Sequence, residues 1–412
     1  MNIILSVHRL CMMFEMTCDY DCIQRGEDMY RPYIARRFRS LRAGLSLDTS
    51  ALARYEDIID LSIGDTDLVT DSRIIDTAFA DAKAGYTHYG DPKGDPELIA
   101  ALCRAWAEDF GQSLTGDRVL VTASSCLGMS LVMLGILDPG DEVLVPGPYF
   151  GPYRDQIELA GGVCVEVPTL PEENYAISED RLCAAVTSRS KAIIFNNPCN
   201  PTGMAYDRGD LEVLARVAQK YDLLIIADEI YTAYLYKGSF IPMRTLPGMA
   251  ERTVTLNSFS KNYLMTGWRV GCIIAEPELL GVFSAINASL IYTAPSVSQR
   301  AAIRALSLRE DIRRQYVARY RERVQYASRR VAALPYLSLV PPKGTFYLFP
   351  GIEKTGLSAS AFSRLMLEKA HILVAPGDVF GKAGQGHIRI ACTVGMDRLK
   401  EAFDRMEGLK FD

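Results

Sequence analysis

The sequence contains no long apolar run, no internal repeat and no low-complexity segment. Its longest apolar stretch, around Leu127 to Leu137, falls well short of the roughly 20 residues that a helix needs to cross a bilayer. The net charge of −5 over 412 residues argues against nucleic acid or an anionic membrane as the main partner. The ordinary balance of apolar and charged residues then predicts a globular protein of about two or three structural units.

The ten cysteines contain no C-x-x-C pair, and several lie in apolar stretches such as "VCVEV" and "GCIIA". This pattern is typical of reduced, structural thiols, so we expect a cytoplasmic protein. Residues 1–28 have no small-residue cleavage site and turn acidic quickly, which argues against a signal peptide. Cys11, Cys18 and Cys22 could be imagined there as metal ligands, but an N-terminal extension, with Met29 as the natural start, is the simpler interpretation. We therefore predict no metal site.

Short β-branched runs alternate with helical patterns from Val119 onward. Runs that are apolar on both faces and separated by helices predict an α/β fold with a mostly parallel sheet, covered on both sides. In such a sheet ligands bind at the carboxyl ends of the strands. The expected strands are "VLVTA", "EVLVPG", "VCVEVP", "KAIIFNNP", "LLIIADEIY", "TVTLNSFS" and "VGCIIAE".

The pattern changes after Pro295. "TFYLF", "HILVA" and "HIRIACTV" predict strands of a smaller C-terminal α+β unit, which we expect "DIIDLSIGD" near the front of the chain to join. Between them, residues 309–334 place Ile312, Tyr320 and Val324 at helical spacing among many arginines. A solvated arginine face on a long helix is the plain interpretation, and a nucleic-acid patch is the alternative.

Two polar motifs follow predicted strands. "NNPCNPTG", residues 196–203, has ordinary turn chemistry, but its two prolines hold Asn200 rigidly where a ligand could meet it. Asp228 ends the apolar strand "IIAD". It could cap the next helix, or it could be a buried carboxylate that holds a cation such as a protonated heterocycle. Tyr231, three residues on, could point at the same ligand.

A third motif, "SFSKNYLMTGWRVG", spans residues 258–271. Lys261 lies among aromatic and aliphatic residues, where an amine loses its charge easily and becomes a nucleophile toward carbonyls. Ser258 and Ser260 offer hydroxyls, and Arg269 offers a planar donor fork suited to phosphate. An aldehyde-bearing phosphorylated cofactor would use all four groups.

In this order and at these separations, the three motifs resemble those of the pyridoxal-phosphate aminotransferases of class I/II, fold type I. The resemblance runs from about Leu61 to Met406. It implies a large cofactor-binding domain, residues 73–305, with a seven-stranded sheet. It also implies a small domain built from residues 29–72 and 306–412.

The resemblance also implies a role for each motif residue. Lys261 would form a Schiff base with pyridoxal 5′-phosphate and then move a proton between the substrate α-carbon and C4′. Asp228 would keep the pyridine nitrogen protonated, and Tyr231 and Asn200 would hydrogen-bond the phenolate oxygen. The implied phosphate ligands are Ser258, Ser260 and Arg269.

Further matches complete the implied cofactor site. "VTASSCLGM" stands where the family has a glycine-containing phosphate turn, so the amides of Ser124, Ser125 and Cys126 should face the phosphate. Phe150 stands where the family stacks an aromatic ring on the cofactor, although core packing would also explain a phenylalanine. Tyr89, in "GYTHYGDPKG", matches a tyrosine that reaches the phosphate of the neighbouring subunit. This match implies a homodimer with a shared active site.

The C-terminal unit supplies the implied substrate contacts. Arg389, in "GHIRIACTV", matches an arginine that grips the substrate α-carboxylate, although an ordinary strand arginine would be solvated. Gly64 matches a backbone position near the same carboxylate, where Asn200 is also expected. The phenylalanine that usually follows this glycine is replaced by Leu68, so the wall near the substrate side chain is not defined.

These matches predict an aminotransferase that exchanges an amino group between an L-amino acid and a 2-oxo acid by a ping-pong cycle. The main alternative is a lyase on the same cofactor, such as a carbon–sulfur β-lyase or a cyclopropane-forming synthase. A ligand-sensing regulator is a third reading, but residues 1–60 are too short for the winged-helix module that usually precedes such domains. No second cation for a dicarboxylate substrate is evident in the sequence.

Overall fold

The computed structural model describes residues 33–35 and 55–411. The chain divides into two compact units, residues 1–46 and 47–412, and everything below concerns the second. The predicted extension and its three cysteines lie outside the described residues. Within the described ranges, no helix combines the length and the apolar character needed to cross a membrane.

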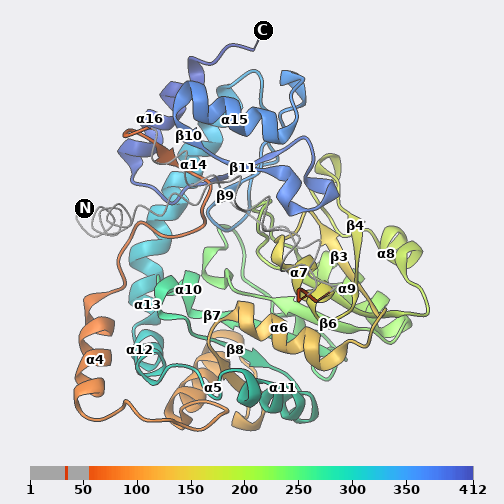
Figure 1. Ribbon diagram of the computed structural model, residues 1–412, viewed down its shortest axis with the longest axis vertical. Helices are drawn as coiled ribbons and strands as arrows, with labels where there is room; N and C mark the ends of the chain where they lie inside the picture. The colour runs from red at the N-terminus through yellow and green to blue at the C-terminus, as the bar shows by residue number, and fades with distance from the viewer. Residues whose placement is uncertain (1–32, 36–54, 412) are drawn as a thin grey trace. The chain divides into compact units, whose positions relative to one another are not determined.

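A seven-stranded sheet in the order β2-β8-β7-β6-β5-β3-β4 forms the centre of this unit (Figure 1). β8 runs antiparallel to both of its neighbours, and the other adjacent pairs are parallel. The predicted mostly parallel sheet is therefore confirmed. At the reversal, Ser258 at the end of β7 lies opposite Gly271 at the start of β8. The strands are β2 (Val119–Thr122), β3 (Glu142–Gly147), β4 (Val163–Pro168), β5 (Ser190–Asn196), β6 (Leu224–Asp228), β7 (Thr253–Ser258) and β8 (Gly271–Ile274).

Helices cover both faces of this sheet because consecutive strand residues point to opposite sides and are apolar on both. Ile194 and Ile226 belong to the core beneath α6, α7 and α11, whereas Ile193 and Ile225 belong to the core beneath α8 and α9. The helices are α4 (Ser72–Lys83), α5 (Pro96–Phe110), α6 (Ser125–Ile136), α7 (Pro152–Leu159), α8 (Glu179–Ala185), α9 (Arg208–Lys220), α10 (Phe259–Asn262), α11 (Pro277–Leu290) and α12 (Ser296–Ser307).

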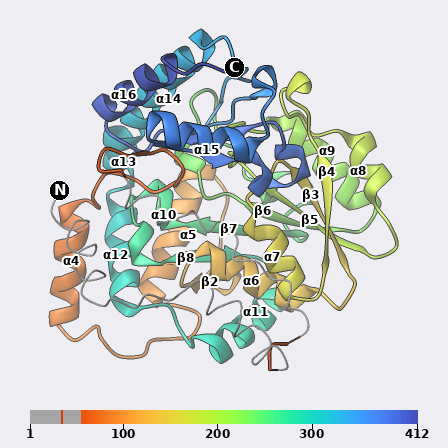
Figure 2. The same cartoon turned by 45° about the horizontal axis from the view of Figure 1, so that its top comes forward.

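Two small sheets and three helices form a second layer of structure. β1 (Ile59–Asp60) pairs in parallel with β10 (Ile372–Leu373), which brings the predicted "DIIDLSIGD" segment to the C-terminal elements. β11 (Ala375–Pro376), β12 (Ile388–Ala391) and β9 (Tyr347–Leu348) form an antiparallel sheet. α14 (Ala318–Ala333), α15 (Ala359–Ala370) and α16 (Met396–Glu407) gather around them (Figure 2). The exact domain limits stay a prediction.

The arginine-rich helical region differs from its prediction in one respect. It consists of α13 (Arg309–Ile312), a π-helical turn and α14, and its apolar positions, including Val324, are buried as the spacing predicts. Its arginines are not all solvated, because Arg323 is buried and forms two hydrogen bonds of 2.6 and 2.8 Å with Asp67. A sequence window shows the spacing of charges on a helix but not the acidic partner from a distant segment.

Candidate active site

Apart from Tyr89 and Arg269, the predicted cofactor residues lie at or soon after the carboxyl ends of five strands, β2, β3, β5, β6 and β7, which share one edge of the sheet. Arg389 on β12 and Gly64 after β1 reach the same edge from the layer that contains the two small sheets. In chain order from β2 to β7, these residues are Ser124, Ser125, Cys126, Phe150, Asn200, Asp228, Tyr231, Ser258, Ser260 and Lys261.

Asp228 is a buried carboxylate, and only one of its two oxygens forms a hydrogen bond within the described part of the chain. Its Oδ2 accepts a hydrogen bond from the hydroxyl of Tyr153, whereas its buried Oδ1 has no partner among the described residues. Burial raises the pKa of Asp228 to about 6, and the hydrogen bond from Tyr153 opposes that rise. An unpaired buried carboxylate oxygen is costly unless a cation or donor meets it. The helix-cap interpretation of Asp228 is not supported, because the next helical turn, Thr232–Tyr234, has Tyr231 at its N-cap position.

Lys261 lies on the short helix α10, directly after β7, and is half-buried. Its Nζ donates to the carbonyl oxygen of Gly64 at 2.6 Å. Burial lowers the pKa of Lys261 to about 8, the nearby carboxylate of Asp65 opposes the shift, and Arg389 and Arg269 reinforce it. This agrees with the expectation that apolar surroundings make the amine easy to deprotonate.

The rest of the lysine motif contains one exposed and two buried polar side chains. Arg269 is exposed, and it adopts a left-handed backbone conformation with φ +54°. Its Nη1 donates to the carbonyl of Thr266 at 2.8 Å. Ser258 and Ser260 are both buried, and the hydroxyl of Ser258 accepts from the amide of Ser260 at 3.1 Å. Ser258 can still donate its own proton, since a hydroxyl has both functions.

The turn after β2 is strained at Ser124. This residue has φ 133° and ψ 158°, a region that only glycine enters easily. Its hydroxyl accepts from the amide of Leu127 at 3.1 Å and so caps α6. Gly271 on β8 makes room for the turn, because a Cβ there would lie 2.8 Å from the amide nitrogen of Ser125. The first turn of α6 includes the exposed Cys126, and backbone amides at the start of a helix are groups that can bind an anion.

Asn200 and Arg389 are joined by a hydrogen bond. The Nη1 of Arg389 donates to the amide oxygen of Asn200 at 2.9 Å, and Nη2 donates to the carbonyl of Ser62. Asn196 fixes the backbone at Asn200, since its side-chain oxygen accepts a hydrogen bond from the amide of Asn200 at 2.7 Å. Arg389 is buried, not solvated, and its Nε has no partner among the described residues.

Tyr231 meets a second tyrosine that the sequence analysis missed. The hydroxyls of Tyr231 and Tyr347 lie 3.0 Å apart. Gly64 must be glycine at this place, because a Cβ would lie 1.8 Å from the Tyr347 hydroxyl oxygen. Tyr153 was missed in the same way. Tyr347 lies in the quoted strand "TFYLF" and Tyr153 lies three residues after Phe150, but nothing in the immediate neighbours of either residue marks it as polar rather than as core.

Two predicted aromatic residues, Phe150 and Tyr89, differ in their place relative to this cluster. Phe150 is half-buried and packs edge-on against Tyr153, with ring centroids 5.6 Å apart. Tyr89 is 86% exposed, and its described ring contact is Tyr292 at 5.3 Å. Tyr89 therefore does not reach the site of its own chain.

The assembled residues fit pyridoxal phosphate. The unpaired oxygen of Asp228 suits a protonated ring nitrogen, and the amine of Lys261 suits an aldehyde. The capped turn at Ser124 and the exposed guanidinium of Arg269 offer amides and positive charge for a phosphate. The charges of Asp228, Arg269 and Lys261 influence the pKa of Cys126, so the turn lies in the same part of the structure as the amine.

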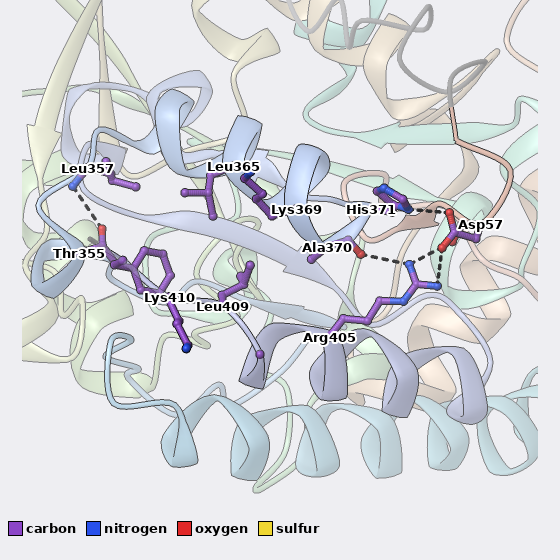
Figure 3. Close-up of a pocket in the computed structure, with 12 residues that line it drawn as sticks. Asp57, Thr355, Leu357, Leu365, Lys369, Ala370, His371, Arg405, Leu409 and Lys410 are labelled. Carbon is purple, nitrogen blue, oxygen red and sulfur yellow. Dashed lines mark hydrogen bonds and ion pairs between the residues drawn. The ribbon is translucent and has the colours of Figure 1, made fainter.

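A separate cavity of about 810 Å³ lies among the C-terminal elements (Figure 3). In it, Asp57 lies 2.7 Å from Nδ1 of His371 and pairs with Arg405 at 2.9 Å. Leu365 and Leu409 line its apolar part. None of the predicted site residues lines this cavity, so it is distinct from the cluster around Lys261.

Comparison with known families shows which class of protein has this fold. The family model described as aminotransferase class I and II matches residues 56–406. The chain belongs to this family and is a transaminase. The lyase alternative is not favoured.

Similar proteins carry transaminase names. The aspartate aminotransferase of Pyrococcus abyssi is 36% identical over 390 residues, which cover 92% of this chain and 96% of the relative. Aromatic-amino-acid aminotransferase 2 of Thermococcus litoralis is also 36% identical, covering 85% of this chain and 91% of the relative. A solved Thermus thermophilus aspartate aminotransferase, a single mutant, aligns with a TM-score of 0.86 at 31% identity. It covers 91% of this chain and 98% of the solved one.

Proposed function

We propose that this transaminase uses pyridoxal 5′-phosphate to exchange an amino group between an L-amino acid and a 2-oxo acid, one substrate after the other. The observation that carries the proposal is that one site contains both a readily deprotonated amine, that of Lys261, and a buried carboxylate oxygen without a partner, that of Asp228. Bound cofactor would supply an electrophilic aldehyde and a ring that accepts electrons from the substrate α-carbon.

The chain's own residues then have distinct tasks. Lys261 binds the cofactor covalently through its amine and, once released, moves a proton from and to the substrate α-carbon. Its pKa of about 8 supports this role, because the neutral amine is present in useful amounts near neutral pH. Asp228 holds a proton on the ring nitrogen, and Tyr231 and the amide nitrogen of Asn200 donate to the ring's phenolate oxygen.

Arg389 is the proposed clamp for the substrate α-carboxylate. Asn200 and Ser62 fix two of its nitrogens, which orients the guanidinium while the buried Nε stays available. A planar fork held in this way suits bidentate carboxylate binding. Gly64 brings its backbone to the same place. Phosphate is bound by Ser258, Ser260, Arg269 and the turn of Ser124, Ser125 and Cys126, with Phe150 beside the cofactor ring.

A homodimer with a shared site is part of the proposal. Tyr89 is almost fully exposed, and it lies beside the exposed Tyr292. Tyr86, Leu290 and Ile291 add further exposed apolar side chains. Large apolar side chains at the surface favour contact with another protein, and a second copy would allow Tyr89 to reach the partner's phosphate site. A cytoplasmic location is supported by the free state of the described cysteines.

The proposal is tested by giving purified holoenzyme a panel of amino acids, each followed by a panel of 2-oxo acids. The panel includes aspartate and aromatic amino acids, the substrates in the names of the relatives. We expect the visible absorption of the cofactor to be lost with a good amino donor and restored by the oxo acid, with a new amino acid as product. Release of pyruvate and ammonia in one step, without transfer of the amino group, would contradict transamination and favour the lyase.

A further inference from the structure

Tyr347 on β9 lies where the cofactor-binding and substrate-binding residues meet. Its side chain is 1% exposed, and its hydroxyl lies 3.0 Å from that of Tyr231. The same hydroxyl occupies the space next to the Cα of Gly64, whose carbonyl receives the hydrogen bond from Lys261. Tyr347 thus touches the proposed donor to the cofactor oxygen and the backbone that meets the amine.

The ring of Tyr347 has a second contact, with the proposed carboxylate clamp. The guanidinium carbon of Arg389 lies 4.6 Å from the ring centroid of Tyr347 and 4.8 Å from that of Phe380. A guanidinium is attracted to the face of an aromatic ring, most strongly where water is excluded. The rings of Tyr347 and Phe380 therefore help to set the plane of the guanidinium, which Asn200 and Ser62 fix at its nitrogens.

We propose that Tyr347 is a positioning residue that links the two halves of the site, its hydroxyl donating to Tyr231 and its ring supporting the guanidinium of Arg389. The inference rests on the proposed function for the roles of Tyr231 and Arg389. The direction of the hydrogen bond follows from that role. If Tyr231 gives its proton to the phenolate oxygen of the cofactor, it can only accept from Tyr347. A donor that itself accepts a hydrogen bond is strengthened.

The two contacts of Tyr347 can be separated by substitution. Tyr347→Phe keeps the ring and removes the hydroxyl, whereas Tyr347→Leu removes both. Tyr175→Phe is the matched control, because Tyr175 is a buried tyrosine whose hydroxyl has no partner among the described residues. Phe380→Leu removes the second ring beside Arg389 and serves if Tyr347→Leu does not fold.

The first measurement is the pH midpoint of the visible absorption change of the holoenzyme. A weaker Tyr231 donor stabilises the phenolate less, so Tyr347→Phe should raise this midpoint by roughly half a pH unit. The second measurement is the dissociation constant of an unreactive carboxylic acid, 3-phenylpropionate, which lacks the amino group. It should rise roughly fivefold in Tyr347→Leu or Phe380→Leu but change less than about twofold in Tyr347→Phe.

An unchanged midpoint in Tyr347→Phe, or an equal shift in Tyr175→Phe, would overturn the hydroxyl's part of the proposal. Carboxylate binding that is as tight in the leucine variants as in the parent would overturn the ring's part. Failure of the proposed function would look different, because the parent enzyme itself would then transfer no amino group in the substrate panel.

Discussion

Replacing Tyr153 by phenylalanine isolates one hydrogen bond at the buried end of the cofactor site. The substitution keeps the ring in the core and removes the hydroxyl that donates to Asp228. Burial already raises the pKa of Asp228 to about 6, and the bond from Tyr153 is the largest influence that opposes this rise. A hydrogen bond to a charged group contributes about 1.5–3 kcal/mol, or roughly one to two pKa units. The pKa of Asp228 should therefore rise to roughly 7–8 in the variant.

This shift has a definite sign in two experiments. Cofactor with a protonated ring nitrogen needs the carboxylate, so the affinity of the apoenzyme for pyridoxal phosphate should fall as the pH drops through about 6. In Tyr153→Phe the fall should begin roughly one to two pH units higher. The pKa of Asp228 in the folded protein lies above the ordinary value of 3.8. Ionisation of Asp228 therefore also lowers the free energy of unfolding of the apoprotein as the pH rises from 3.8 to about 6. The variant should go on losing stability to roughly pH 7–8.

Titration of apoenzyme with pyridoxal phosphate between about pH 5.5 and 8.5, followed by tryptophan fluorescence, measures the affinity profile. Tyr149→Phe is the control, since Tyr149 is buried nearby but its hydroxyl accepts from Nε of Arg154 at 3.0 Å. A midpoint that does not move in Tyr153→Phe, or that moves equally in Tyr149→Phe, would refute the reasoning.

Three further predictions address the other parts of the site. Lys261→Ala should lower turnover by about 10²- to 10⁴-fold, yet the variant should retain cofactor through gel filtration. Arg389→Lys should raise KM about 10- to 100-fold with a smaller effect on kcat. Full turnover in either variant would contradict the assignment. Ser124→Gly should increase the free energy of unfolding by about 1 kcal/mol, because relief of strain exceeds the small cost of a glycine cap. Ser124→Ala should lower it by about 1 kcal/mol, and urea denaturation that gave both variants the same sign would argue against strain. Mixing Tyr89→Ala chains with Lys261→Ala chains should restore cofactor affinity and activity in the hybrid, because one of its two sites then has both residues. No gain over the separate variants would argue against a shared site.

Much of the fold and of the site was predictable from the sequence, because the polar motifs follow apolar strands along the chain. Runs such as that ending at Asp228 are apolar on both faces, which indicates a covered sheet, and polar residues directly after them must lie at its edge. The direction of β8 was not predictable, because an apolar run such as "GCII" is the same in a parallel and an antiparallel strand. That choice depends on its pairing with β2 and β7.

The missed and misjudged residues have a common physical cause. Tyr153 meets Asp228 across 75 positions of the chain, and Tyr347 meets Tyr231 across 116. Within its own stretch of sequence, a buried tyrosine looks like any other core residue. Its polar role depends on the group that its hydroxyl contacts in the folded protein. Arg269 is the converse case, since its sequence neighbours are apolar but its own side chain is exposed.

The reversal of chain direction between β7 and β8 has a consequence for the length of the segment between them. Ser258 and Gly271 are paired at its base, so residues 259–270 form a closed loop with both ends hydrogen-bonded into the sheet. Lys261 and Arg269 both belong to this loop. An inserted or deleted residue could not be absorbed at either end, and it would change the spacing between the amine and the guanidinium. The residues of this segment can therefore be exchanged more freely than their number can be altered.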